Sequence, residues 1–146
     1  MTGGCVFCGI LAGQQPASVV CEDDIAVAIM DLRQAVPGHV LVLPRVHAET
    51  LDLLDEDTAA HLMRVAHRIA RAMQRTSAPA GFNLWQSNGE AGGQEVPHVH
   101  LHMHPRITND GLLRIYPAAP PAPARTELDR LATILRDALD LPQARP

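Results

Sequence analysis

The first third of the chain alternates short apolar runs with polar turns. Ser18–Val20 and Ile25–Met30 are rich in apolar and β-branched residues, and the polar residues Glu22–Asp24 separate them. Two such runs around a short polar turn are typical of a β-hairpin. A third run, His39–Leu43, stops at Pro44, which lacks the N–H that a strand uses in its ladder. The pattern predicts three strands in this part of the chain.

A change of period to three and four residues predicts a helix from Asp55 to about Thr76. Asp55 and Asp57 stand at its start, where carboxylates bond to free backbone amides and complement the helix dipole. Pro79 and Gly81 follow its end. Its apolar positions are Ala59, Leu62, Met63, Ala66, Ile69, Ala70 and Met73, with arginines on the opposite side.

Two further strands are expected after this helix. Phe82–Gln86 has the composition of a strand, and the residues 87–93 that follow it read as a loop. A last strand is predicted from Glu95 to about His104, with Pro105 closing it. The pattern therefore predicts three strands, one long helix and two further strands in this part of the chain.

The end of the chain has a different composition. Residues Pro117–Pro123 are rich in proline and alanine, which is typical of an extended connector. Glu127–Leu139 again has helical spacing. We therefore expect one domain at residues 1–110, followed by a proline-rich connector and a C-terminal helix at residues 111–146.

Composition narrows the class of protein. The chain has 146 residues, 47% of them hydrophobic and 19% charged, with a formal net charge of −4. These values describe a soluble globular domain large enough to bury a core. Mild acidity, without a lysine-rich or arginine-rich face to replace counterions, argues against a nucleic-acid-binding surface. No apolar run is long enough to cross a bilayer, so no membrane association is expected.

The cellular compartment is inferred from the N-terminus and the cysteines. The first residues, Met1–Cys5, lack the basic and apolar regions of a secretion signal, so a cytoplasmic location is expected. Three cysteines do not suggest a disulfide framework. In a reducing compartment, free thiols or metal ligation are the expected states.

Candidate chemistry is concentrated in a run of alternating histidines. His98, His100, His102 and His104 alternate with Val99, Leu101 and Met103. On a strand, this spacing places the imidazoles on one face and the apolar residues on the other. A neutral imidazole can attack or take a proton, and a neighbouring ring can donate to a phosphoryl oxygen. Ordinary bonded histidines or a metal-binding strip are the alternatives. The preceding Gly92–Gln94 has a backbone flexible enough to direct amides at an anion.

The pair Cys5 and Cys8 forms a second candidate cluster. Two thiolates with two residues between them can share a tetrahedral zinc ion, which then needs two more ligands. Free thiols and a redox pair are the alternatives, although a redox pair usually lies between a strand and a helix. Cys21 has no partner in this scheme and reads as a small apolar residue.

The residues Gly93–His102 resemble the signature of the histidine triad (HIT) family of nucleotide hydrolases and transferases. The resemblance covers roughly residues 5–106 and is greatest for the small bacterial members. It includes the blocks Val6–Ile10, Met30–Leu32, Pro37–His47 and Ser87–Gly89.

The resemblance implies a fold, an assembly and an activity. The fold would be α+β, with an antiparallel sheet of about five strands and one long helix, and the protein would form a homodimer. The activity would be attack on the α-phosphorus of nucleoside phosphoramidates or related AMP and GMP esters, through a nucleotidyl-histidine intermediate. Purine nucleotides are the implied substrates. The alternatives are cleavage of dinucleoside polyphosphates and a non-catalytic nucleotide-binding protein.

The same resemblance implies a role for individual residues. His100 would be the nucleophile, His102 would bind the phosphate oxygens and the leaving group, and His98 would orient the triad, with His47 behind it. Asp31 would hold the ribose hydroxyls, although turn chemistry alone also explains an aspartate there. Residues Phe7, Ile10, Ile29 and Leu32 would form the walls of the base pocket, with core packing as the alternative, and Ser87, Gly93 and Gln94 the phosphate loop.

The resemblance also completes the metal site and marks two departures. A structural zinc ion would be held by Cys5, Cys8, His47 and His98, a closed set of ligands that would not activate water. Glu95 stands where several members have a serine, and an ionised carboxylate cannot donate a hydrogen bond to phosphate. His104 stands where the family usually has an apolar residue, and no role is assigned to it.

Overall fold

The computed structural model describes residues 4–112, 118 and 120–139. The chain divides into two compact units, Met1–Asp110 and Gly111–Pro146. The first unit contains the sheet, and the second contains a helix. Pro117 and Ala119 of the expected connector lie outside the described residues. None of the described helices is long and apolar enough to cross a membrane.

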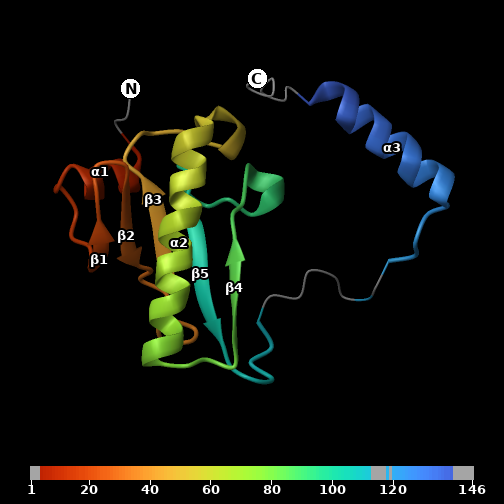
Figure 1. The fold of residues 1–146 in the computed structure, drawn as a ribbon. Helices are drawn as coiled ribbons and strands as arrows, with labels where there is room; N and C mark the ends of the chain where they lie inside the picture. Colours follow the sequence, from red (N-terminus) through yellow and green to blue (C-terminus); the bar gives the residue numbers. More distant parts are fainter. Residues whose placement is uncertain (1–3, 113–117, 119, 140–146) are drawn as a thin grey trace, which may run out of the picture. The chain divides into compact units, whose positions relative to one another are not determined.

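The first unit is a five-stranded antiparallel sheet with one long helix on it, which confirms the predicted α+β class (Figure 1). The strands lie side by side in the order β1-β2-β3-β5-β4. The elements are α1 (Val6–Leu11), β1 (Val19–Glu22), β2 (Ala26–Met30), β3 (Val40–Pro44), α2 (Glu56–Thr76), β4 (Gly81–Trp85) and β5 (Leu101–Arg106), with short 3-10 turns at Leu51–Leu53 and Glu90–Gly92.

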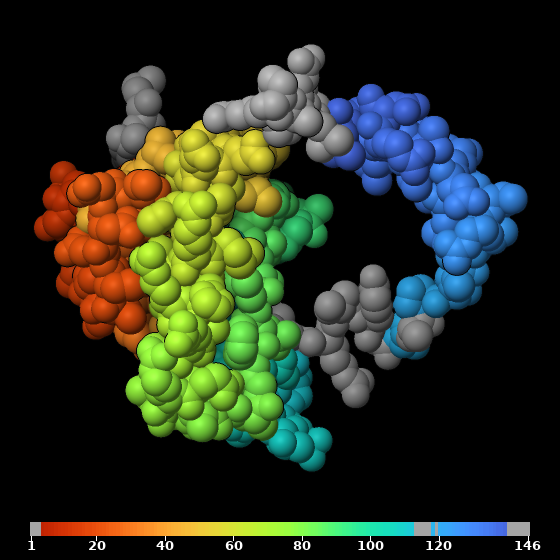
Figure 2. Space-filling model, viewed as in Figure 1, coloured from red at the N-terminus to blue at the C-terminus, as the bar shows by residue number. Residues whose placement is uncertain are grey.

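Strand alternation gives the sheet two different apolar faces. One face packs against α2, whose side chains form the front of the first unit in Figure 2; this face carries Ala26, Ala28, Val40, Val42, Leu101 and Met103. The other face carries Val27, Ile29, Leu41 and Leu43, which pack with Phe7 of α1. Because His102 lies between Leu101 and Met103 on β5, it points to the face opposite α2.

Helix α2 begins as its sequence predicts. The side chain of Asp55 accepts a hydrogen bond from the backbone N–H of Thr58 at 2.8 Å, so it caps the helix. The buried side chains are Leu62, Val65, Ala66, Ile69 and Met73. Met63, expected among the core positions, is instead 51% exposed, because it lies about 100° around the helix from Leu62, which is on the buried face.

The predicted strand from Glu95 to His104 is wrong in its first half. Strand β5 begins only at Leu101, and the residues before it form bends and turns. Pro97 interrupts the segment, since it cannot donate to a ladder. At the other end, Pro105 lies within the strand instead of closing it. There β5 pairs only with β4, because its pairing with β3 ends at Met103, so the missing N–H costs no bond to β3.

The second unit contains helix α3 (Arg125–Ala138), close to the predicted Glu127–Leu139. Glu127 and Arg130 form a double hydrogen bond on its surface. Such exposed pairs three residues apart add a few tenths of a kcal/mol to a helix.

Candidate functional site

A cavity of about 580 Å³ opens on the face of the sheet opposite α2. Its lining combines an apolar wall with polar groups and two of the alternating histidines. The wall includes Val6, Phe7, Ile10, Ile29, Leu32 and Leu41; the polar and aromatic side includes Asp31, Arg33, His39, Trp85, Gly93, Glu95, His100 and His102. A concave, mostly apolar site with a few convergent polar groups is the usual form of a small-molecule site.

His98 is fully buried, and it bonds to strand β3 through its ring and to His100 through its backbone. Its Nε2 donates to the carbonyl oxygen of Pro44 at 3.0 Å. Since a carbonyl only accepts, Nδ1 of the neutral ring carries no proton and is free to bind a cation. Burial lowers the pKa of His98, which keeps the ring neutral.

His100 is oriented by the backbone of His98. Its Nδ1 donates to the carbonyl oxygen of His98 at 2.6 Å, and only 5% of the residue is exposed. Because Nδ1 is the donor, Nε2 carries no proton when the ring is neutral. The ring of Phe7 packs edge-on against His100, with the ring centres 5.1 Å apart. His100 therefore lines the cavity as an imidazole held in a fixed orientation by its bond to His98.

His102 lies between an indole and another imidazole. The ring of Trp85 stacks on that of His102, with the ring centres 4.4 Å apart and only 4° between the planes. This contact follows from the sheet register, in which Trp85 lies opposite His102. Burial, followed by the positive charge that His100 or His39 can carry, lowers the pKa of His102 to about 4. The ring is therefore neutral near pH 7.

His39 is a site residue to which the sequence analysis assigned no role. Its Nδ1 lies 3.3 Å from the carbonyl oxygen of Arg33 and 3.6 Å from Oδ2 of Asp31. With that nitrogen donating, Nε2 of His39 accepts from Nδ1 of His102 at 3.0 Å. Burial lowers the pKa of His39. A chain of hydrogen bonds therefore runs from the carbonyl of Arg33 through His39 to His102, with Asp31 beside the first ring.

His104 follows the alternation of β5 but does not line the cavity. Its Nδ1 donates to the carbonyl oxygen of Pro105 at 2.7 Å. Its ring packs against that of His39, with the ring centres 4.6 Å apart. It is buried. The structure therefore places His104 behind His39, outside the cavity lining.

The predicted apolar walls and Asp31 meet at the cavity. Phe7, Ile10, Ile29 and Leu32 all line it. Phe7 and Ile29 are buried, whereas Leu32 is 97% exposed. Asp31 is buried, and its Oδ1 accepts a hydrogen bond from the backbone N–H of Arg33 at 2.7 Å. This bond is the turn interaction that the sequence also allowed for Asp31. Its second oxygen faces His39.

The predicted phosphate loop is only partly at the cavity. Gly93 lines it and has a φ of 79°, a conformation that favours glycine. The side chain of Gln94 is used inside the loop, where it accepts from the N–H of Gly89 and donates to the carbonyls of Glu49 and Val96. Ser87 does not line the cavity, and its carbonyl accepts from Gln86.

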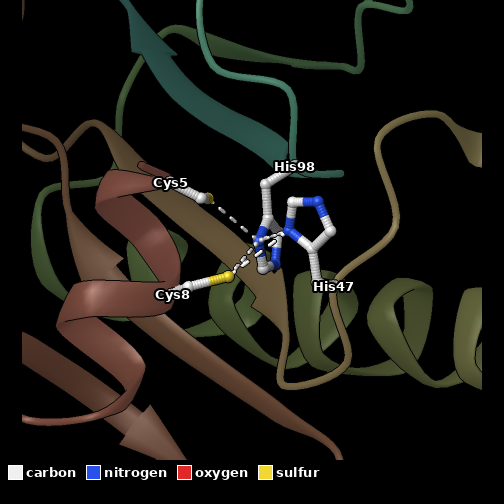
Figure 3. A group of neighbouring side chains, drawn as sticks. All are labelled: Cys5, Cys8, His47 and His98. Carbon is white, nitrogen blue, oxygen red and sulfur yellow. Dashed lines mark hydrogen bonds between the residues drawn. The ribbon is translucent and has the colours of Figure 1, made fainter. Parts of the chain in front are cut away.

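Cys5, Cys8, His47 and His98 converge beside the cavity (Figure 3). Their ligand atoms all lie within 4.8 Å of one another, and four of the separations are 3.2 to 3.6 Å. Ligands around a tetrahedral zinc ion are separated by roughly 3.3 to 3.8 Å, so the four side chains fit such an ion. Burial, with a smaller effect of Cys5, raises the pKa of Cys8.

Comparison with known proteins agrees with this architecture. A crystal structure of a HIT family protein from Bacillus anthracis superposes with a TM-score of 0.88 at 34% identity, covering 94% of this chain and 98% of that one. A Zn-bound histidine triad family protein from Mycobacterium smegmatis has a TM-score of 0.71 at 34% identity, covering 95% of this chain and all of that one.

A relative from Saccharomyces cerevisiae, named adenosine 5′-monophosphoramidase, is 29% identical over 140 residues, which are 95% of this chain and 83% of that protein. The family model of the HIT domain matches residues 12–109, which include β1 to β5, α2 and the histidines of the cavity. Because that match extends over more than half of the chain, the protein belongs to the histidine triad (HIT) family.

Proposed function

We propose that the protein is a hydrolase or transferase of nucleotides that acts on the α-phosphorus of nucleoside phosphoramidates or related AMP and GMP esters. The observation that carries the proposal is the bond from Nδ1 of His100 to the carbonyl of His98, because it leaves Nε2 as a nucleophile in the cavity. The phosphoramidase name of the yeast relative supports the substrate class.

In the first step, Nε2 of His100 attacks the α-phosphorus and the bond to the leaving group breaks. The product is a nucleotidyl-histidine, which water then hydrolyses to the free nucleotide. Covalent attack divides one difficult displacement into two easier ones. His98 takes part by fixing the ring of His100 through its carbonyl oxygen.

His102 binds the phosphate oxygens and the leaving group. In the neutral ring, Nδ1 donates to His39, so Nε2 has no proton to offer. The negative charge of a bound phosphate favours protonation of this ring, and the nearby Asp31 acts in the same direction. The protonated ring then donates its proton to the departing nitrogen or oxygen.

The remaining lining residues hold the nucleoside. Phe7, Ile10, Ile29 and Leu32 enclose a purine base, and Asp31 accepts hydrogen bonds from the ribose hydroxyls. Gly93 brings backbone near the phosphate. For Ser87 and Gln94, which lie outside the cavity lining, we retain a role in shaping the phosphate loop, as the internal bonds of Gln94 support.

A structural zinc ion belongs to the same proposal, held by Cys5, Cys8, His47 and His98. The separations of the four ligand atoms support it, as does the Zn-bound relative from M. smegmatis. The bond from His98 to Pro44 fixes the ring so that Nδ1 faces the metal, as outer bonds of ligating histidines usually do. When bound, the ion would tie α1 to the loop that carries the triad.

We also propose a homodimer in the cytoplasm, without nucleic-acid or membrane partners. Strand β4 is an edge of the sheet, and its Phe82 and Leu84 are 40% and 37% exposed. An edge strand with exposed apolar side chains favours pairing with a second chain. Light scattering on a sizing column measures the mass directly.

The activity is tested by turnover of adenosine phosphoramidate and of diadenosine polyphosphates, with wild type beside His100→Ala. We expect hydrolysis of the phosphoramidate that is at least 1,000-fold slower in the variant, roughly the effect of losing a nucleophile. Preferred cleavage of diadenosine polyphosphates would favour the alternative function, a dinucleoside polyphosphate hydrolase. Equal, negligible turnover by both proteins with retained AMP binding would mean a non-catalytic nucleotide-binding protein.

A further inference from the structure

An ion pair closes one side of the cavity rim. Nη2 of Arg33 lies 2.6 Å from Oε2 of Glu95, and Nη1 lies 3.2 Å from Oε1, so the guanidinium binds both carboxylate oxygens. The two residues are 62 positions apart in the chain, and both line the cavity. The pair therefore joins the turn after β2 to the loop that precedes the triad.

The pair lies at the mouth of the cavity, whereas His100 lies at its floor. The side chains of Arg33 and Glu95 are 73% and 66% exposed, and His100 is only 5% exposed. In a displacement at phosphorus, the attacking and leaving atoms are roughly in line. Attack from the floor therefore directs the leaving group toward the open rim.

The rim carries a negative charge in the same cavity as the triad. Hydrogen bonding to Arg33, together with its charge, lowers the pKa of Glu95, so the carboxylate is ionised near pH 7. Glu95, His100 and His102 line the same cavity, so a bound ligand can contact the carboxylate and both rings. The ionised carboxylate of Glu95 repels an anionic leaving group. Its two bonds to Arg33 also occupy the cation that could otherwise bind such a group.

We propose that Glu95, paired with Arg33, is a specificity-determining residue that disfavours leaving groups with extra negative charge. Leaving groups that are neutral or cationic amines pass the rim, whereas a phosphate or polyphosphate leaving group meets Glu95 and finds Arg33 occupied. This inference rests on the proposed function and deepens it, since it separates amine leaving groups from polyphosphates by charge alone.

The test compares the dissociation constants of AMP and ADP by calorimetry. The β-phosphate of ADP is an anionic group at the leaving position. The variants are Glu95→Gln, which keeps the shape and removes the charge, and Arg33→Gln, which leaves the carboxylate without its partner. Glu90→Gln is the matched control, because it removes the same charge from the same loop at a residue outside the cavity lining.

We expect Glu95→Gln to increase the affinity for ADP relative to AMP by about fivefold or more, since a freed guanidinium gains a charge-assisted hydrogen bond to phosphate. Arg33→Gln should change the ratio in the opposite direction, and Glu90→Gln should leave it within twofold of wild type. An unchanged ratio in Glu95→Gln, or the same shift in Glu90→Gln, would overturn the inference.

A second measurement separates this inference from the proposed function. The ratio of kcat/KM for a phosphoramidate with a cationic amine to that for diadenosine triphosphate should fall by about fivefold or more in Glu95→Gln. If wild type binds AMP but hydrolyses neither substrate, the proposed activity is wrong, and the AMP/ADP ratio still decides the role of Glu95. If wild type does not bind AMP at all, both proposals are wrong.

Discussion

The carbonyl oxygen of His98 accepts the Nδ1 proton of His100 at 2.6 Å, while the ring of His98 faces Cys5, Cys8 and His47. One residue thus holds the proposed nucleophile with its backbone and the proposed metal site with its side chain. Any change that moves the backbone of His98 will move the ring of His100 with it. The two candidate sites are therefore mechanically linked.

Removal of the metal is the first prediction. Protein purified without added zinc should contain about one zinc ion per chain, and chelation should lower its melting temperature, because four ligands tie α1 to distant loops. Cys8→Ser should lose the metal, whereas Cys21→Ser should keep it, since Cys21 is exposed and outside the cluster. Metal analysis is the measurement, and a zinc content near zero in wild type would contradict the metal site.

The second prediction concerns acid stability. Burial lowers the pKa of His102 to about 4 and also lowers that of His39, whereas an unfolded histidine titrates near about 6.5. As the pH falls from about 6.5 toward 4, the unfolded chain binds protons that these native rings do not. The free energy of unfolding should therefore fall through this window.

Urea unfolding between about pH 7 and pH 5 measures this slope. His102→Gln removes one of the titrating rings and should flatten the dependence, whatever its effect at pH 7. A wild-type stability that stays constant or rises as the pH falls would show that the buried rings are not held neutral.

The third prediction concerns Trp85, the only tryptophan of the chain. Its stack on His102 keeps that ring in place for the phosphate. Trp85→Leu should reduce kcat/KM by about twofold to tenfold, the effect expected from losing an aromatic pair, and Trp85→Phe should reduce it less. Steady-state kinetics on adenosine phosphoramidate provides the measurement. Equal kcat/KM for the leucine variant and wild type would exclude a positioning role.

The fourth prediction concerns the core under α2. Leu62 is 1% exposed and packs against the sheet, whereas its neighbour Met63 is 51% exposed. Leu62→Ala should lower the free energy of unfolding by about 2–5 kcal/mol, and Met63→Ala by less than about 1 kcal/mol. Urea unfolding of both variants at one pH compares them. Similar losses in the two variants would mean that α2 is rotated from the orientation described.

Much of this fold could be predicted from local pattern, and the exceptions have physical causes. Helix α2 was recognisable because 21 residues provide a clear period and Asp55 provides a cap. The six-residue helix α1 was not predicted, since so short a helix depends on packing of Phe7 against the sheet more than on its own sequence.

The site could be predicted less completely than the fold. Alternation of histidines suggested a continuous strand, but residues 95–100 are held instead by single bonds such as that from the N–H of Val99 to Ala48. The role of His39 was not predicted because it depends on register: Leu41 lies opposite His102, which brings His39 to the same ring. Local sequence contains no information on that pairing. The family resemblance identified the positions of Asp31 and Gly93, and the structure brings both to the cavity.

The most direct test of the proposed function is to trap the covalent intermediate. Wild-type protein mixed with excess adenosine phosphoramidate and quenched within milliseconds should carry one nucleotidyl group, located by peptide mass spectrometry on His100. The same experiment with His100→Ala should give no adduct. A nucleotidyl group on another residue, or rapid turnover in the His100→Ala variant, would contradict attack by His100.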